Sequence, residues 1–177
     1  MAITRLNNNS ITSITALPSG VGVLTEVDQW RVTTSFANAS NGVAEIVSSN
    51  WERADTVFDK IGTGLSQSSG IFTFPSTGSY LINAVSSYYP NGANSDVRMS
   101  IRVTTDNSSY NTRAEAISGA AGADRPEMIS VSCIVDVTDT SNVKFAIYTS
   151  GTTSTNFWRA DTGQQRFGFT CVKLGNT

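Results

Sequence analysis

Short segments with an apolar residue at every second position run through this chain, and they constrain its fold more than any other feature. In residues 97–103, valine, methionine and isoleucine alternate with arginine and serine, which places the two kinds on opposite faces of a β-strand. Similar segments occupy residues 29–36, 56–62, 70–74, 79–89, 128–137, 142–150 and 166–174. Stretches rich in Gly, Pro, Asn, Asp and Ser separate them, as expected for turns. The spacing predicts an all-β antiparallel sandwich, jelly roll or barrel.

Composition supports strands over helices. Charged residues make up only 15% of the chain, so Ser, Thr, Asn and Gly must cover much of its surface. The best helical candidate, residues 110–122, is interrupted at Gly119 and Gly122 and has no sustained apolar face. A formal net charge of −2 argues against binding to nucleic acid or to an anionic membrane. No apolar run approaches the roughly 20 residues needed to span a bilayer, so no membrane insertion is expected.

The first 24 residues differ from the remainder. They are polar, rich in asparagine and only weakly alternating, and they end at the "PSGVG" boundary. We interpret residues 1–24 as an extended N-terminal arm and residues 25–177 as a single β-domain. The arm becomes ordered only against another surface; the alternative is a terminus without a role. The apolar residues that would anchor it are Ile3, Leu6, Ile11, Ile14 and Leu17. The arm lacks the apolar middle of a secretory signal.

The central segment, residues 56–89, resembles the complement C1q and tumour necrosis factor jelly-roll family. A Phe-Asp strand is followed by a Gly-Ser connector, a strand with two phenylalanines, a Pro-Ser-Thr-Gly turn and a strand opening with tyrosine. Residues 132–148 fill the place of the next landmark, and the closing aromatic-x-Gly-Phe pattern is matched at 167–169. The resemblance covers about residues 30–174, and it implies an antiparallel jelly roll of the C1q/TNF-like type. The chain has no collagen-like stalk, in contrast to the animal members.

The resemblance also implies a homotrimer, because in this family one sheet of each sandwich packs against its neighbours about a three-fold axis. The large aromatic residues of the matched motifs are candidates for that interface. They serve equally well as intrachain core, and both alternatives stay open at this point. These residues are Phe72, Phe74, Tyr80, Phe167 and Phe169.

A second resemblance concerns the opening "MAITRLNN" and the segments "DQWR" and "SNWERAD". These are similar to small structural proteins of tailed, marine-type bacteriophages. That similarity implies a virion protein, assembled in the host cytoplasm, whose partners are itself and other capsid or tail proteins. No heptad, collagen or β-helix repeat is present to build a fibre shaft. Capsid decoration and stabilisation is therefore favoured; the alternative is a tail-fibre knob or a receptor- or carbohydrate-binding module for host attachment.

Enzyme signals are absent from the sequence. The chain contains no histidine, no Gly-x-Ser-x-Gly elbow, no phosphate loop and no dinucleotide fingerprint. We therefore expect no catalytic residues, no metal site and no cofactor. A calcium site built from Asp and backbone carbonyls is possible in jelly rolls, but no Asp-x-Asp-x-Asp spacing marks one here. Cys133 and Cys171 lie in alternating apolar segments, as two buried free thiols or as a disulfide.

Aromatic residues near the predicted loops are the best candidates for ligand contact. Exposed rings beside Asn and Asp are suited to stacking on a sugar of the host surface and to hydrogen bonding with it. The same rings could anchor each loop to its own sandwich, and the sequence leaves this open. The candidates are Tyr88, Tyr89, Tyr110, Phe157 and Trp158.

Overall fold

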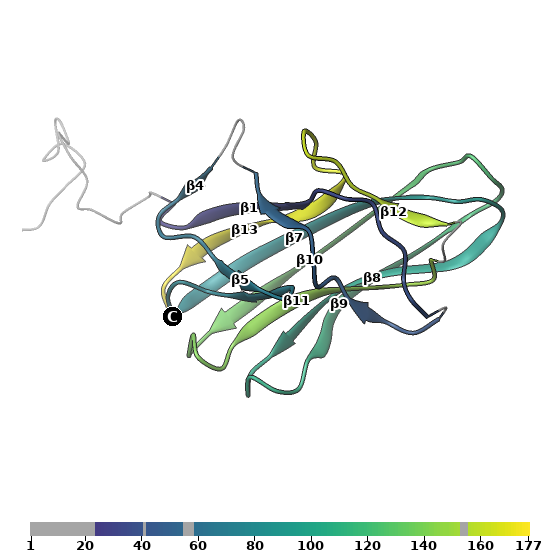
Figure 1. Ribbon diagram of the computed structural model, residues 1–177. Coiled ribbons are helices and arrows are strands. Elements are labelled where there is room, and N and C mark those ends of the chain that lie inside the picture. Colours follow the sequence, from purple (N-terminus) through teal and green to yellow (C-terminus); the bar gives the residue numbers. More distant parts are fainter. Residues whose placement is uncertain (1–23, 41, 55–58, 153–155) are drawn as a thin grey trace, which may run out of the picture.

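The computed structural model describes residues 24–40, 42–54, 59–152 and 156–177, which form two antiparallel sheets packed face to face (Figure 1). Sheet A has the strand order β10 (Glu127–Val137), β7 (Gly78–Tyr89), β13 (Phe167–Gly175), β1 (Val27–Val32) and β3 (Trp51–Arg53). The short strands β12 (Phe157–Arg159) and β4 (Lys60–Ile61) pair with β7 and β1. Sheet B has the order β5 (Ser66–Ser68), β6 (Ile71–Thr73), β11 (Lys144–Ser150), β8 (Asn94–Thr104) and β9 (Asn111–Ala120), and β2 (Glu45–Ile46) pairs with β11.

The long strands fall where the alternating segments predict them. The segment 110–122, the best helical candidate, instead forms the edge strand β9, because its residues pair along β8. The strands β2, β3, β5 and β12 have only two or three residues and carry too little pattern to be read from sequence. No helix in the described ranges is long and apolar enough to cross a membrane. The predicted arm lies outside the described residues, except for Leu24, which precedes β1.

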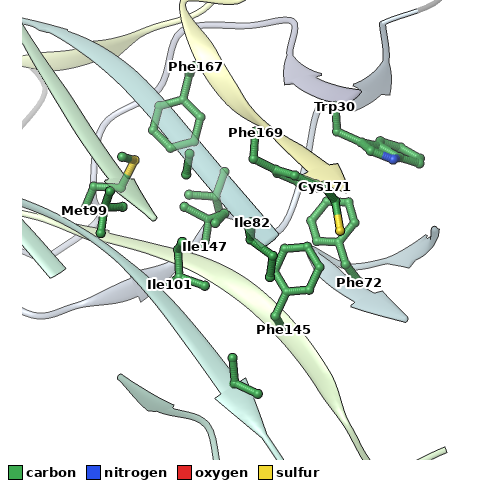
Figure 2. Packing of buried hydrophobic residues seen from close by; sticks show 14 of the residues in the cluster. Trp30, Phe72, Ile82, Met99, Ile101, Phe145, Ile147, Phe167, Phe169 and Cys171 are labelled. Carbon is green, nitrogen blue, oxygen red and sulfur yellow. The ribbon is translucent and has the colours of Figure 1, made fainter. Parts of the chain in front are cut away.

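The core lies between the two sheets and is strongly aromatic (Figure 2). Phe72 of β6 is fully buried and contacts Phe169 of β13, with ring centroids 4.7 Å apart. Sheet B contributes the apolar residues of β8, whose alternation the sequence predicts correctly. Those buried residues are Val97, Met99, Ile101 and Val103.

The Pro-Ser-Thr-Gly turn connects β6 in sheet B to β7 in sheet A and requires glycine at its last position. Gly78 has a φ of +139°, a conformation that residues with a side chain rarely adopt. A Cβ atom there would lie 2.4 Å from the carbonyl oxygen of Gly175. The turn is a scaffold element that brings the two sheets together.

The two cysteines are free thiols. Cys133 of β10 and Cys171 of β13 both lie opposite Ile82, one on each side of β7. Two strand spacings separate their backbones by about 9–10 Å, which exceeds the reach of a disulfide. Burial raises the pKa of both thiols, so neither is an activated nucleophile.

The sandwich has two distinct ends. At one end, here called the arm end, the start of β1 pairs with the C-terminal part of β13. Gly175 of β13 pairs there with Ser79 at the start of β7. At the other, the loop end, lie the connections from β7 to β8, from β9 to β10 and from β11 to β12. Figure 1 shows the C-terminus beside the start of β7, at the arm end. Attachment through the N-terminal segment would therefore leave the loop end free.

Candidate functional site

The outward face of sheet A carries a continuous aliphatic row across five strands. The strand register aligns Ile134 with Leu81, Leu81 with Val172, Val172 with Val27, and Val27 with Ile61. At about 4.8 Å per strand the row is about 19 Å long. Ile134 and Ile61, at its two ends, are 64% and 42% exposed. Between them Leu81 and Val172 are half-buried, and Val27 is only 8% exposed. Aliphatic side chains left exposed on the outward face of a sheet are typical of an interaction site.

The neighbouring rows on the same face are mixed. The next row toward the loop end is polar, with Asn83 opposite both Thr170 and Ser132. Beyond it, Val85 lies opposite Gly168, and Met128 of β10 is 71% exposed. The aliphatic row, bordered by hydrogen-bonding groups, has the composition of an interface core with a polar rim.

The aromatic residues that the sequence offered as trimer interface or core all lie inside the sandwich. Their side chains are at most 2% exposed and pack between the sheets, so they are not available to a neighbouring molecule. They are Phe72, Phe74, Tyr80, Phe167 and Phe169.

The outward aliphatic residues are the ones that sequence reasoning missed. A detectable signal exists in the strand 79–89, where Leu81 and Val85 occupy positions that alternate with the core residues and would ordinarily be polar. The row itself could not be read from sequence, because it is assembled from five strands whose relative register is set only on folding.

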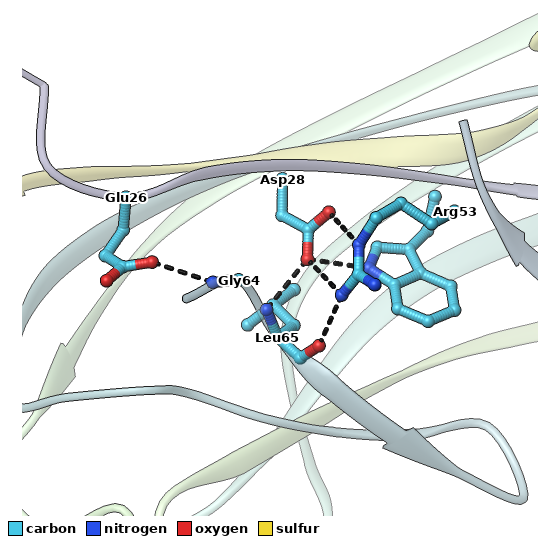
Figure 3. Close-up of polar contacts among 6 residues, drawn as sticks. Glu26, Asp28, Arg53, Gly64 and Leu65 are labelled. Atoms are coloured by element: carbon cyan, nitrogen blue, oxygen red, sulfur yellow. Dashed lines mark hydrogen bonds and ion pairs between the residues drawn. The ribbon is translucent and has the colours of Figure 1, made fainter. Parts of the chain in front are cut away.

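A buried ion pair holds one end of the row in place (Figure 3). Asp28 of β1 has a side chain that is only 3% exposed, and Arg53 of β3 binds both of its oxygens, at 2.9 Å and 3.1 Å. The same carboxylate accepts hydrogen bonds from the backbone N–H of Leu65 and from the indole N–H of Trp30. The Arg53 guanidinium also stacks over the Trp30 ring, 4.6 Å from its centroid.

This ion pair fastens the segment that follows β4. Arg53 donates to the carbonyl oxygen of Leu65, and Glu26 accepts from the backbone N–H of Gly64 at 2.9 Å. Gly64 has a φ of +74°, and a Cβ atom on it would lie 2.8 Å from the Asp28 carboxylate. The polar contacts thus fix the loop against β1, and Ile61 is presented at the edge of sheet A.

The loop end is secured by a buried polar network around Asn38. Its side-chain amide donates to the carbonyl oxygen of Thr149 at 2.9 Å. Its side-chain oxygen accepts from the hydroxyl of Thr152 at 2.7 Å and from the indole of Trp158 at 3.1 Å. Because every polar atom of this amide has a partner, the network stabilises the loops without exposing a site.

The five loop aromatics separate into different environments. Trp158 and Tyr88 are fully buried and pack against each other in the core, so they anchor the loops. Tyr89 and Phe157 are half-buried and stack at the loop end, with centroids 5.4 Å apart, and the Tyr89 hydroxyl donates to Asp124. Tyr110 lies at the opposite end of the sandwich, the arm end, in the connection between β8 and β9. The structure therefore does not bring the five candidates together.

No family model and no curated protein matches this chain. Solved structures do: three of murine APRIL, a tumour necrosis factor family member, are similar over 84% of this chain and 98% of theirs. The TM-scores are 0.61 at pH 5.0, 0.61 at pH 8.0 and 0.57 at pH 8.5, with identities of 12%, 13% and 13%. The fold is a TNF-like jelly roll. The predicted fold class is thereby confirmed, and at this identity the likeness concerns the fold alone.

The jelly roll offers little chemistry within its described residues. No group of three or more Cys, Asp or Glu side chains there could hold a metal ion. Pocket-like hollows lie beside the segment 36–50, with a volume of about 180 Å³, and beside Arg113 and Ile134, with about 150 Å³. Glu45, the carboxylate that lines the first hollow, accepts hydrogen bonds from the backbone N–H groups of Ala39 and Ser40.

Proposed function

We propose that this chain is a non-enzymatic structural protein of a phage particle, which forms a homotrimer through sheet A and is anchored by its N-terminal arm. The aliphatic row from Ile134 to Ile61 carries the proposal. A folded chain that stays alone would leave Ile134, Ile61 and parts of Leu81 and Val172 in water, whereas two further copies arranged about a three-fold axis would cover them. The TNF-like fold supports that arrangement, because the family it resembles associates through the equivalent face.

Decoration of the capsid is the role that this geometry favours. The first described residue and the C-terminal strand lie at the arm end, opposite the connections of the loop end. An arm of residues 1–24, extended at about 3.3 Å per residue, would reach about 80 Å, enough to bind across neighbouring shell subunits. A trimer with three such arms gains avidity for a lattice without a shaft.

Ile134→Glu is expected to convert the trimer to a folded monomer. Ile134 is the most exposed residue of the row, and the substitution places a charge in the proposed interface, where no partner would compensate its desolvation. Sedimentation or light scattering at micromolar concentration should give about three times the chain mass of 18.8 kDa for the wild type and the single-chain mass for the variant.

Ile117→Glu is the matched control. Ile117 is also an isoleucine on a strand, 55% exposed, but it lies on β9 in sheet B. We expect this variant to remain trimeric. A wild-type monomer at micromolar concentration, or equal dissociation of the two variants, would contradict the proposed interface.

Deletion of residues 1–20 is expected to abolish binding to particles and to leave the trimer intact. The truncated chain keeps the core and sheet A, which form the jelly roll and the proposed trimer contact. It loses the predicted anchor residues, which all precede position 18. Particles stripped of this protein are mixed with full-length or truncated trimer, and the bound fraction is measured after sedimentation. Binding of the truncated trimer at full-length affinity would refute the anchoring role.

A further inference from the structure

The outward face of sheet B carries two cationic side chains for which the described residues provide no carboxylate partner. Arg102 of β8 lies over the ring of Tyr148 of β11, with its guanidinium carbon 4.3 Å from the ring centroid. None of the described residues accepts a hydrogen bond from this guanidinium, and its Nε is sealed from solvent without a partner. Lys144 of β11 donates to the neutral amide oxygen of Asn107 at 2.7 Å.

The strand register places these two residues on the same face of sheet B. Arg102 lies opposite Ala146, and Lys144 lies opposite Thr104, so the two are diagonal neighbours on one face. Such positions are about 7–8 Å apart, within reach of long side chains. The Arg102 guanidinium extends over Tyr148, toward the loop end, and the Lys144 ammonium extends to Asn107, at the arm end. The two positive charges are thus spaced along one face, where each can attract an acidic group of one extended ligand.

Carboxylates near this region are already engaged. Asp106 accepts hydrogen bonds from the backbone N–H groups of Ser108 and Ser109, at 2.9 Å and 2.7 Å. Glu115 of β9 pairs with Arg98, which also binds Asp96. Arg98 and Arg102 therefore differ on the same strand and the same face: among the described residues, Arg98 has carboxylate partners and Arg102 has none.

The Arg102 guanidinium has one tyrosine ring beneath it, and a second tyrosine lies close to the first. Tyr148 lies beneath it, and Tyr110 is half-buried at the start of the neighbouring strand β9. Burial raises the pKa of Tyr110, and Tyr148 adds to that rise, which indicates that the two phenols are close enough to interact. The face thus combines a fork of hydrogen-bond donors with aromatic surface.

We propose that this face, formed by Arg102, Lys144, Tyr148 and Tyr110, binds an acidic saccharide that bears a carboxylate on its ring. The free Nη donors of an arginine match a carboxylate in a bidentate manner. The tyrosine rings offer an apolar surface to the C–H face of the pyranose, as aromatic side chains do for flat apolar groups. The lysine supplies the second charge for a neighbouring acidic unit.

The position of the face suits a host-surface ligand. It lies on the outward side of sheet B, whereas the proposed trimer contact uses the outward side of sheet A. The site is complete within one chain, so it does not rest on the proposed trimer. In a trimer, three copies would point outward and bind a repeating polysaccharide with avidity.

The test is calorimetric titration of full-length protein with trigalacturonate, with a neutral trisaccharide and a sulfated neutral trisaccharide as comparison ligands. We expect trigalacturonate to bind, more weakly at higher salt, and the neutral sugar not to bind. Arg102→Met, which keeps the aliphatic stem over Tyr148, should weaken binding at least ten-fold. Arg102→Lys should lose most of the affinity because an ammonium cannot bind a carboxylate bidentately.

Arg98→Met is the matched control, since Arg98 is neutralised by Asp96 and Glu115. It should bind trigalacturonate like the wild type. Absence of wild-type binding at millimolar ligand, or an equal loss in both arginine variants, would overturn the proposal. Tighter binding of the sulfated sugar than of trigalacturonate would overturn the carboxylate assignment. Thermal unfolding of each variant checks that the protein tested is folded. Tyr148→Leu removes the aromatic ring but leaves the Arg102 guanidinium, and it should also weaken binding.

Discussion

Phe72→Ala is expected to lower the free energy of unfolding by about 3–5 kcal/mol. Phe72 is fully buried at the centre of the aromatic core. Its ring centroid lies 5.4 Å from that of Trp30, 5.1 Å from those of Trp51 and Phe145, and 4.7 Å from that of Phe169. Truncation to alanine removes the contacts of a whole ring and leaves a cavity between the two sheets, which the surrounding aromatic residues cannot close without leaving their own packing.

Chemical denaturation at one fixed protein concentration measures this loss, because a trimer would make the apparent stability depend on concentration. Phe157→Ala is the control. Phe157 is half-buried at the loop end, and Tyr89 is its ring partner among the described residues, so its loss should cost about 1 kcal/mol. Equal destabilisation by the two substitutions would mean that the core does not depend on Phe72.

Arg53→Met is expected to destabilise the jelly roll by about 3 kcal/mol. The substitution leaves the Asp28 carboxylate, whose side chain is 3% exposed, buried without its counter-charge. The Arg53 side chain is 25% exposed, so the expected loss lies at the lower end of the range for broken buried pairs. Urea denaturation measures the change in the free energy of unfolding. The segment 59–65 should also be held less firmly against β1 in this variant.

A double substitution separates the buried charge from the loss of packing. Asp28→Asn combined with Arg53→Met removes the unpaired charge, so the double variant should be more stable than Arg53→Met alone. Arg166→Met serves as the control, because Arg166 lies 3.5 Å from Asp161 and both side chains are about one-third exposed; it should cost less than about 1 kcal/mol. A double variant no more stable than the single one would show that the buried carboxylate is not the cause.

Local patterns were sufficient to predict much of the scaffold. The alternation in residues 97–103 predicted a strand with one buried face, and the Pro-Ser-Thr-Gly turn predicted the tight connection that Gly78 makes. Both depend on interactions within a few residues of the chain, which a sequence shows directly. The two-residue strand β2 and the pairing of Arg53 with Asp28 were not predictable in this way, because their partners are distant in sequence.

The candidate surfaces show most clearly which features the sequence determined and which only the tertiary structure decided. By itself the sequence determined that this chain forms short antiparallel strands, that Tyr80 and Phe169 would be buried somewhere, and that enzyme motifs are absent. Only the tertiary structure decided that these aromatic residues lie between the sheets and that Leu81 and Ile134 lie on the outward side of sheet A. The reason is that alternation divides a strand into two faces, while strand pairing and sheet packing determine which face is covered. The same applies to Arg102, which pairs with no carboxylate of the described ranges because folding places Asp96 and Glu115 beside Arg98 instead.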